Sequence, residues 1–267
     1  MEIPATFAIA GLTSILYCIF FWSASLRYKK TWLTDIAWSS GFFVVYLVVL
    51  LINANFSFKQ NLILLMLFLW GFRLTFYLVV RNLNKNQEFE YQKLKEKWGK
   101  RILSGTPLLV SLWQALGLFL VSAPAILVST YKEVTQIEFY DILFSGLWLA
   151  GFFLESFADL ELYKFKKNPA NQGRILKEGL WKYSRHPNYF GEILMWLAIF
   201  FLILPVPNAV FTIISPIFLA VSLLRFTGVK VVEKRFQYDL EYTSYANSTN
   251  KILPIPRTNT QNTENIV

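Results

Sequence analysis

The apolar residues of this chain are gathered into long blocks, and this arrangement limits the folds that it can adopt. Most blocks approach the ~20 residues that a helix needs to cross ~30 Å of hydrocarbon. The last two are shorter, and the segment Pro205 to Asn208 between them predicts a tight hairpin turn. We therefore expect an all-α, polytopic membrane helix bundle of about seven transmembrane helices, at residues 5–26, 32–52, 62–80, 108–129, 139–157, 189–204 and 209–224.

The composition also favours a membrane protein. Charged residues make up 16% of the chain, against the ~25% that is usual in soluble domains. Glu2 is the only charge before the first block, so we expect a retained span and not a signal peptide. We expect residues 1–254 to form one integral-membrane domain, whose half at 139–254 carries the polar motifs. The Thr- and Asn-rich residues 255–267 are expected to be a disordered cytoplasmic tail.

Lysine and arginine are distributed very unevenly between the loops that seven spans would create. One set of alternating loops holds 23 of them, whereas the other set holds only Lys59 and Lys132. Basic residues accumulate in cytoplasmic loops, so we expect the N-terminus outside and the C-terminus in the cytoplasm. The net charge of +9 then reflects topology and attraction to anionic lipid, or in part a phosphorylated cofactor.

Metal and nucleic acid are not expected as ligands. One histidine and one cysteine are too few for a conventional zinc site. The partners that we expect are the lipid bilayer and a lipophilic small molecule.

Several ionisable residues fall within or at the ends of the expected spans. A charge at the centre of a membrane helix costs ~2.5–3.5 kcal/mol on insertion scales. The expected topology places all of these residues on the cytoplasmic side, where a shared water-filled cavity would lower the cost. They are Asp35, Arg73, Glu155, Asp159, Glu161 and Glu192.

Helical spacing groups these residues with others. Residues four or seven apart lie on one helix face. The alternative is an interfacial helix face whose long basic side chains reach water, although acids cannot do so over the same distance. The sets are Arg73 with Tyr77 and Arg81, Glu155 with Asp159 and Lys166, and Lys230 with Lys234 and Tyr238.

The stretch SRHPNYFGE, residues 184–192, contains the only histidine, His186, beside Arg185. A helix that begins near Pro187 would place Asn188, Tyr189 and Glu192 on one face of its first turn. The free amides of a helix start suit an anionic or acceptor-rich ligand. Capping and solvation of a span would explain one or two polar residues here, but not five in nine.

The run GLWKYSRHPNYFGEILMW (179–196), preceded by ESFADLELYKFKKNPANQGR (155–174), resembles a bacterial multi-span family of uncharacterised proteins of the DUF1295 type. That family is grouped with the steroid 5-alpha-reductase C-terminal domain. The similarity extends to DIAW (35–38), to WGFRLTFYLVVRN (70–82), and to Glu233, Tyr242, Tyr245 and KILPIP near the end. Membrane isoprenylcysteine methyltransferases share the Arg-His-Pro-x-Tyr core and a similar C-terminal pattern.

The resemblance to steroid 5-alpha-reductases implies NADPH in a cytoplasm-facing cavity and an enone substrate that enters from lipid. No Gly-x-Gly-x-x-Gly follows a strand, so any dinucleotide site is not of the Rossmann type. Motif matching assigns Asp159, Lys166, Asn188, Glu192, Lys234 and Tyr238 to the cofactor. With the polar groups above, the expected cofactor-binding set is Arg73, Arg81, Glu155, Asp159, Lys166, Arg185, His186, Asn188, Tyr189, Glu192, Glu233, Lys234, Tyr238 and Tyr245.

Asp35 is the expected catalytic residue. Burial in the second span would raise its pKa and suit it to donate a proton towards the substrate carbonyl. Steroid reductases carry an acid in span two and a tyrosine in span three; Asp35 fits the first, whereas Tyr77 is not at the matching position. Asp35 can equally be a structural partner of Arg73.

Two positions depart from the family pattern. Glu90 replaces an arginine, and Glu161 stands where glutamine is usual. Phosphate binding would then depend on residues 93–101, residues 164–167 and Arg185.

Three functions remain open from the sequence. The first is a membrane-embedded, NADPH-dependent reductase of the conjugated C=C in a lipid-like enone. The second is an S-adenosylmethionine-dependent methyltransferase, in which His186, Tyr189, Glu192 and Glu233 would surround a smaller, zwitterionic cofactor. The third is a non-enzymatic lipid-binding protein.

Overall fold

The structure is a computed structural model that describes residues 2–83, 99, 106–132 and 137–256. Within these residues every extended regular element is a helix, and the only strand-like feature is an isolated bridge between Ser184 and Asn250. The predicted all-α fold is therefore confirmed for the described part of the chain. The predicted tail lies outside it from residue 257 onward.

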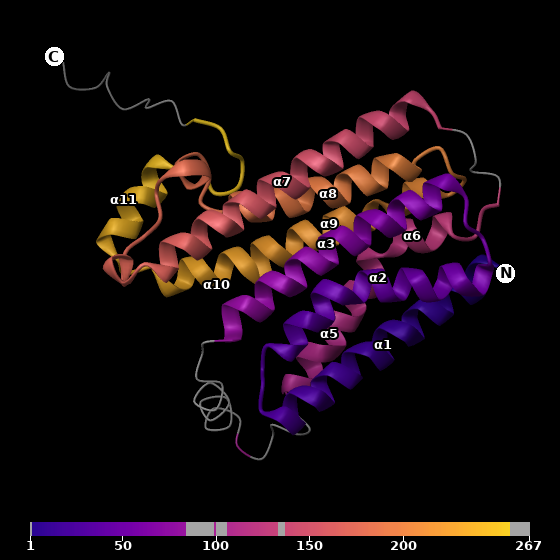
Figure 1. Ribbon diagram of the computed structural model, residues 1–267, viewed down its shortest axis with the longest axis horizontal. Helices are drawn as coiled ribbons and strands as arrows, with labels where there is room; N and C mark the ends of the chain where they lie inside the picture. Colours follow the sequence, from indigo (N-terminus) through magenta and orange to yellow (C-terminus); the bar gives the residue numbers. More distant parts are fainter. Residues whose placement is uncertain (1, 84–98, 100–105, 133–136, 257–267) are drawn as a thin grey trace. The chain divides into compact units, whose positions relative to one another are not determined.

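The helices follow the predicted blocks closely (Figure 1). Short 3₁₀ segments lie at Pro169–Asn171, at Gly179–Lys182 and at Ala209–Ile213, and a π-helical turn lies at Ser222–Phe226. The α-helices are α1 (Ile3–Tyr28), α2 (Leu33–Asn53), α3 (Phe58–Leu83), α5 (Thr106–Val121), α6 (Ala123–Val128), α7 (Phe139–Lys167), α8 (Pro187–Ile203), α9 (Ile214–Val221), α10 (Gly228–Arg235) and α11 (Leu240–Ser248).

Five helices in the described residues are long and apolar enough to cross a bilayer. They are α1, α2, α3, α7 and the continuous segment Ala209–Arg235, which contains α9 and α10. Two shorter apolar helices accompany them, Leu108–Val121 and Pro187–Ile203. These helices identify the chain as an integral membrane protein.

The block at 108–129, expected as one span, is two helices. α5 ends at Val121 and α6 begins at Ala123, with Pro124 in its first turn. Proline has no backbone N–H, and its ring clashes with the carbonyl group four residues earlier, so it starts helices well and interrupts them in the middle. The apolar pattern did not predict this interruption, because it counts apolar residues without weighing Pro124; whether the two helices together form one span stays a prediction.

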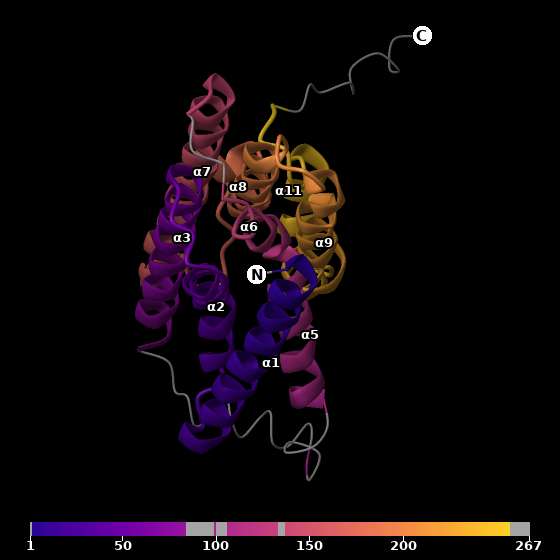
Figure 2. The same cartoon turned by 90° about the vertical axis from the view of Figure 1, so that its right-hand side faces the viewer.

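The chain divides into two compact units. Unit 1 comprises residues 1–144 and 199–218, and unit 2 comprises residues 145–198 and 219–267. In unit 1, α1 packs against α2 and α5, and α2 packs against α3 (Figure 2). The Ser39 and Thr75 hydroxyls, 2.6 Å apart, join α2 to α3 where these helices approach closely.

Unit 1 contains a fully buried ion pair. Lys59 and Asp141, each 2% exposed, bring Nζ and Oδ1 within 2.7 Å. The same ammonium group donates to the Tyr140 hydroxyl at 2.9 Å and the Leu202 carbonyl at 3.4 Å, while Asp141 Oδ2 accepts from the Glu138 N–H at 3.0 Å. Lys59, which the sequence placed in an exposed loop, instead lies in the first turn of α3. Its desolvation is tolerated because each donor group finds an acceptor.

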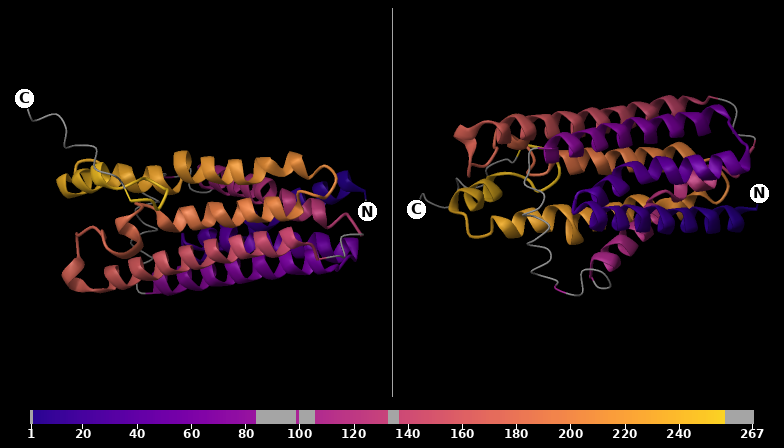
Figure 3. Two further views of the ribbon diagram at one scale, coloured as in Figure 1. Left: turned by 90° about the horizontal axis from the view of Figure 1, so that it is seen from above. Right: turned by 60° about the horizontal axis from the view of Figure 1, so that its bottom comes forward.

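In unit 2, α7 and α8 run side by side (Figure 3), and glycine permits their close approach. A Cβ atom on Gly191 would lie 2.6 Å from the Gly151 carbonyl oxygen and 2.8 Å from the Glu155 nitrogen. These are backbone atoms that cannot move aside. Any larger residue at position 191 would therefore push apart the two helices that carry the candidate site.

The buried ion pair of unit 1 gives a prediction about stability. Asp141→Leu should destabilise the protein by ~3–5 kcal/mol, since it leaves the Lys59 ammonium buried without its counter-charge. Lys59→Met combined with Asp141→Leu should recover most of the loss. Thermal unfolding of the purified protein in detergent measures both, and a double variant no better than Asp141→Leu would contradict this account.

Candidate functional site

The SRHPNYFGE stretch is held in place by the C-terminal segment. α8 begins at Pro187, as the sequence predicted. The Ser184 hydroxyl accepts a hydrogen bond from the His186 N–H at 3.1 Å and donates to the Ile252 carbonyl at 2.7 Å. The Arg185 N–H donates to the Asn250 carbonyl at 2.9 Å. Residues 250–252 thus fix the backbone that presents Arg185 and His186.

Glu233 is the centre of an ionic cluster at this point. Its carboxylate lies 2.9 Å from Arg185 Nη2 and 3.1 Å from Lys251 Nζ. His186 Nε2 lies 3.8 Å from Glu233 Oε1, which is too long for a hydrogen bond. The cluster ties α10 and the C-terminal segment to the start of α8.

His186 is only 3% exposed. Burial lowers the pKa of its imidazole below the ordinary value, and the Glu233 carboxylate opposes this shift without cancelling it. The lowered pKa favours the neutral imidazole, in which one ring nitrogen accepts a hydrogen bond and the other donates one.

Tyr189 completes an aromatic wall. Its ring stacks on His186, with centroids 5.5 Å apart and planes inclined by 16°. The same ring also meets Gly228, where an added Cβ atom would lie 2.5 Å from Tyr189 Cζ. Gly228 directly follows the π-helical turn Ser222–Phe226 and Thr227. π-helical turns are rare and often accompany functional sites; here the turn precedes the α10 segment that carries Glu233.

The acidic residues expected in the site are buried in unit 2. Glu155 and Asp159 lie one turn apart on α7, and Glu192 lies on α8. The Asn188 amide donates to Asp159 Oδ1 at 3.1 Å, so this predicted pair of residues is brought together. An acid of α7 therefore orients an amide at the start of α8.

Tyr245 has a structural function. Its hydroxyl donates to the Trp181 carbonyl, with the Ser184 carbonyl at 3.4 Å, and burial raises its pKa. The Trp181 indole in turn donates to the Ala158 carbonyl of α7 at 3.2 Å. Tyr245, expected to bind cofactor, thus fastens the 3₁₀ turn Gly179–Lys182, and it also lines the cavity described below.

These elements enclose a cavity of about 140 Å³ within unit 2. Aromatic rings form much of its wall, and three basic residues also line it: Lys166, Arg174 and Arg185. Four buried polar atoms of lining residues have no hydrogen-bond partner in the described part of the chain: Arg185 Nε, His186 Nε2, Asn188 Oδ1 and the Tyr242 hydroxyl. A buried polar atom without a partner costs about 1–3 kcal/mol, so a ligand that supplied complementary groups would be favoured here.

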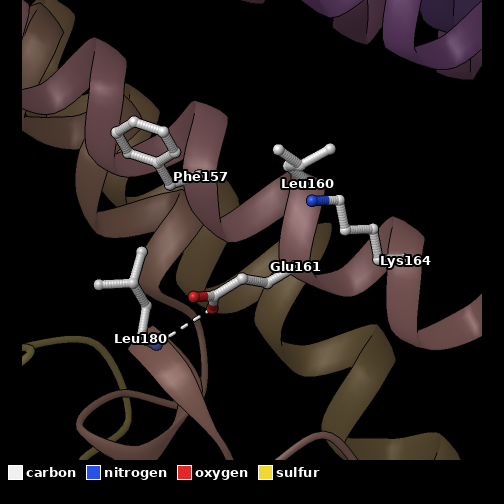
Figure 4. Close-up of a pocket in the computed structure, with 5 residues that line it drawn as sticks. All are labelled: Phe157, Leu160, Glu161, Lys164 and Leu180. Atoms are coloured by element: carbon white, nitrogen blue, oxygen red, sulfur yellow. Dashed lines mark hydrogen bonds between the residues drawn. The ribbon is translucent and has the colours of Figure 1, made fainter.

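The other side of α7 carries an open groove of about 460 Å³ (Figure 4). Phe157, Leu160 and Leu180 make it largely apolar, with Lys164 at one end. Glu161 points towards the 3₁₀ turn, where its Oε2 accepts from the Leu180 N–H at 3.0 Å. Leu180 lines the groove and the next residue, Trp181, lines the cavity.

Not every predicted residue reaches the cavity. Lys234 and Tyr238 are exposed and are not among the residues that line it. Conversely, Trp181, Phe236 and Arg174 line the cavity and were not predicted to do so. Trp181 lies in the GLWKYS run and Arg174 ends the 155–174 run, so both belong to motifs that the sequence analysis singled out; the inward direction of their side chains could not be predicted from those motifs.

Asp35, Arg73 and Arg81 belong to unit 1. Arg81 Nη2 lies 4.0 Å from Asp35 Oδ2, and these side chains are 40% and 49% exposed. The Asp35 side chain, in the first turn of α2, is therefore about half exposed within the protein, and its catalytic role stays a prediction. The Arg81 guanidinium also lies 5.5 Å from the centre of the Tyr77 ring.

The fold and the cavity define a helical integral membrane protein with a polar, aromatic-walled cavity at the start of α8. Residues 21–249 match the sequence profile of a family described as "Protein of unknown function (DUF1295)". The chain belongs to this family, as the motifs in the sequence indicated. No curated protein and no solved structure matches the chain.

Two tyrosines that line the cavity provide a matched test of this geometry. Tyr245→Phe should lower the free energy of unfolding by ~1–3 kcal/mol, because it removes the donor to the buried Trp181 carbonyl. Tyr242→Phe should change it by less than ~0.5 kcal/mol, since that hydroxyl makes no hydrogen bond here. Thermal unfolding compares them, and equal losses would show that the hydroxyls are not used as described.

Proposed function

We propose that this protein is a membrane-embedded, NADPH-dependent reductase of the conjugated C=C in a lipid-like enone. The observation that carries the proposal is the cavity of unit 2, where buried polar atoms without partners share one space with three basic side chains. Such a combination suits a ligand that carries both phosphate groups and hydrogen-bonding groups.

The charge of the lining favours an anionic cofactor. Lys166, Arg174 and Arg185 line the cavity, and Glu233 offsets part of this charge through its ion pairs with Arg185 and Lys251. The phosphates of NADPH would be suitable partners for these cations. About 140 Å³ is below the 300–1,000 Å³ of typical ligand pockets, so this cavity would take one part of a dinucleotide and not the whole.

Individual residues can be assigned parts in this proposal. Arg185 and Lys166 would hold phosphate, and Asn188, oriented by Asp159, would bond to an amide or hydroxyl group of the cofactor. Bound NADPH would supply a hydride to the β-carbon of the enone and become NADP⁺, while a proton completes the α-carbon. Asp35 stays the sequence's prediction for that proton donor, with a carboxyl group that is half exposed in unit 1.

A methyltransferase that uses S-adenosylmethionine is the second candidate. The small cavity volume and the stacked rings of His186 and Tyr189 favour it, because both suit a compact cofactor with a flat base. The three basic side chains would then have no phosphate to bind. The apolar groove of Figure 4 supports a third candidate, a lipid-binding protein without enzymatic activity.

Ligand titration separates these candidates. NADPH at 100 times its Kd should stabilise the purified protein by ~2.7 kcal/mol, measured as a rise in unfolding temperature. Asn188→Ala and Glu192→Ala should abolish this rise, and Asn61→Ala, at an exposed position of unit 1, should preserve it. Stabilisation by S-adenosylmethionine alone would support the methyltransferase instead, and stabilisation by neither would support the lipid-binding protein.

We further propose that α5 with α6, and α8, also cross the membrane. This gives seven spans, with the N-terminus outside and the C-terminus in the cytoplasm, and it is supported by the uneven distribution of basic residues. Helix α8 has 17 residues, which is within the range of natural spans.

Labelling of single cysteines in intact cells tests this topology. With Cys18 replaced by serine, a membrane-impermeant thiol reagent should modify Asn208→Cys from outside and should not modify Asn171→Cys. Asn208 lies in the turn after α8, and Asn171 ends the short 3₁₀ segment after α7. The reverse pattern would show that the protein has the opposite orientation in the membrane. Modification of both positions from outside would show that α8 does not cross the membrane.

A further inference from the structure

The helix α10 has two different faces. Val232 and Phe236, one turn apart, line the cavity, and Glu233 beside them pairs with Arg185. The opposite face holds Lys230 and Lys234, four residues apart, and a second row, Val231 with Arg235, lies between that face and Val232. All four side chains are exposed.

Two residues that follow α10 in the chain are also highly exposed. Tyr238 is 91% exposed and Leu240 is 87% exposed, although both are large and apolar in part. We call Lys230, Val231, Lys234, Arg235, Tyr238 and Leu240 the outer patch. It combines three cations with three apolar side chains, and it contains no acidic residue.

The acids nearest in the sequence are engaged elsewhere. Glu233 faces Arg185 and Lys251 on the other side of α10. Asp239 accepts a hydrogen bond from the Tyr242 N–H at 3.1 Å and caps the start of α11. Glu241 forms an ion pair with Lys177, with Oε1 and Nζ 2.6 Å apart. The positive charge of the outer patch is therefore not neutralised by these carboxylates.

The position of the outer patch along the chain places it near a bilayer surface. The candidate span Ala209–Arg235 has 27 residues. At ~1.5 Å per residue it is ~40 Å long, close to the ~40–45 Å thickness of a bilayer with its headgroups. The last turn of α10 and the residues after it then lie at headgroup depth, where tyrosine and basic side chains are enriched.

We propose that the outer patch binds the surface of a bilayer that contains anionic phospholipids. Its lysines and arginine pair with lipid phosphate and carboxylate groups, and Val231, Tyr238 and Leu240 insert among the headgroups. Lys234 and Tyr238 thereby have a function that does not involve the cavity, and this inference does not depend on which cofactor the cavity binds.

A fluorescent label at Tyr238→Cys tests the proposal in the full chain with Cys18 replaced by serine. The protein is placed in nanodiscs of phosphatidylcholine alone or with ~30% phosphatidylglycerol, and quenching by the neutral, water-soluble acrylamide is measured. We expect quenching to be at least ~2-fold weaker in the anionic discs. A label at Ser248→Cys, exposed at the far end of α11, should be quenched equally in both.

Two charge variants make the test specific. Lys230→Gln with Lys234→Gln should remove the difference between the two kinds of disc at position 238. Arg27→Gln with Lys30→Gln, which also removes two charges but from the end of α1, should leave the difference unchanged. Equal quenching at position 238 in both discs, whether strong or weak, would overturn the proposal; strong quenching in both would indicate a surface for a soluble partner.

Discussion

The requirement that buried charged and polar groups find partners governs this structure, because most of the chain is too apolar to solvate them. Lys59 and Asp141 satisfy each other completely in unit 1, with Tyr140 and a backbone carbonyl as additional partners. In unit 2, Asp159 is engaged by Asn188 and Glu233 by Arg185 and Lys251. In hydrocarbon the alternative to such pairing is a penalty of several kilocalories per mole, so these contacts decide how the helix ends are arranged.

The two clusters differ in a way that bears on function. Around Lys59 and Asp141 nearly every polar group has an ionic or hydrogen-bond partner, which is typical of a cluster that stabilises the fold. Around His186 the pairing is incomplete, since its Nε2, Asn188 Oδ1 and the Tyr242 hydroxyl remain without hydrogen bonds beside a cavity. Buried polar atoms without a hydrogen bond are costly, and a bound ligand is the simplest means of recovering that cost. This contrast is why the cavity, and not the ion pair of unit 1, is the candidate site.

Some features of the candidate site could be predicted from the spacing of residues along a helix. The start of α8 at Pro187 and the common face of Glu155 and Asp159 are properties of a helix, and helical periodicity predicts them. The helix interruption before Pro124 could also have been predicted from the proline itself, but the continuous apolar pattern of this block did not indicate it. Motif matching did not predict the directions of Lys234 and Tyr238, since α10 turns Lys234 away from the side on which Val232 and Phe236 lie, and Tyr238 lies exposed beyond its end.

The sequence by itself determined the all-α fold, the membrane character and the family, because long apolar blocks admit few other structures and the family's motifs are contiguous. Only the tertiary structure decided which distant residues form hydrogen bonds with one another. Nothing in the chain order predicts that residues 250–252 fasten the SRHPNYFGE stretch or that Tyr245 bonds to Trp181. The physical reason is the separation along the chain. Helix periodicity depends on residues a few positions apart, whereas a hydrogen bond between residues more than sixty positions apart depends on how the intervening helices pack.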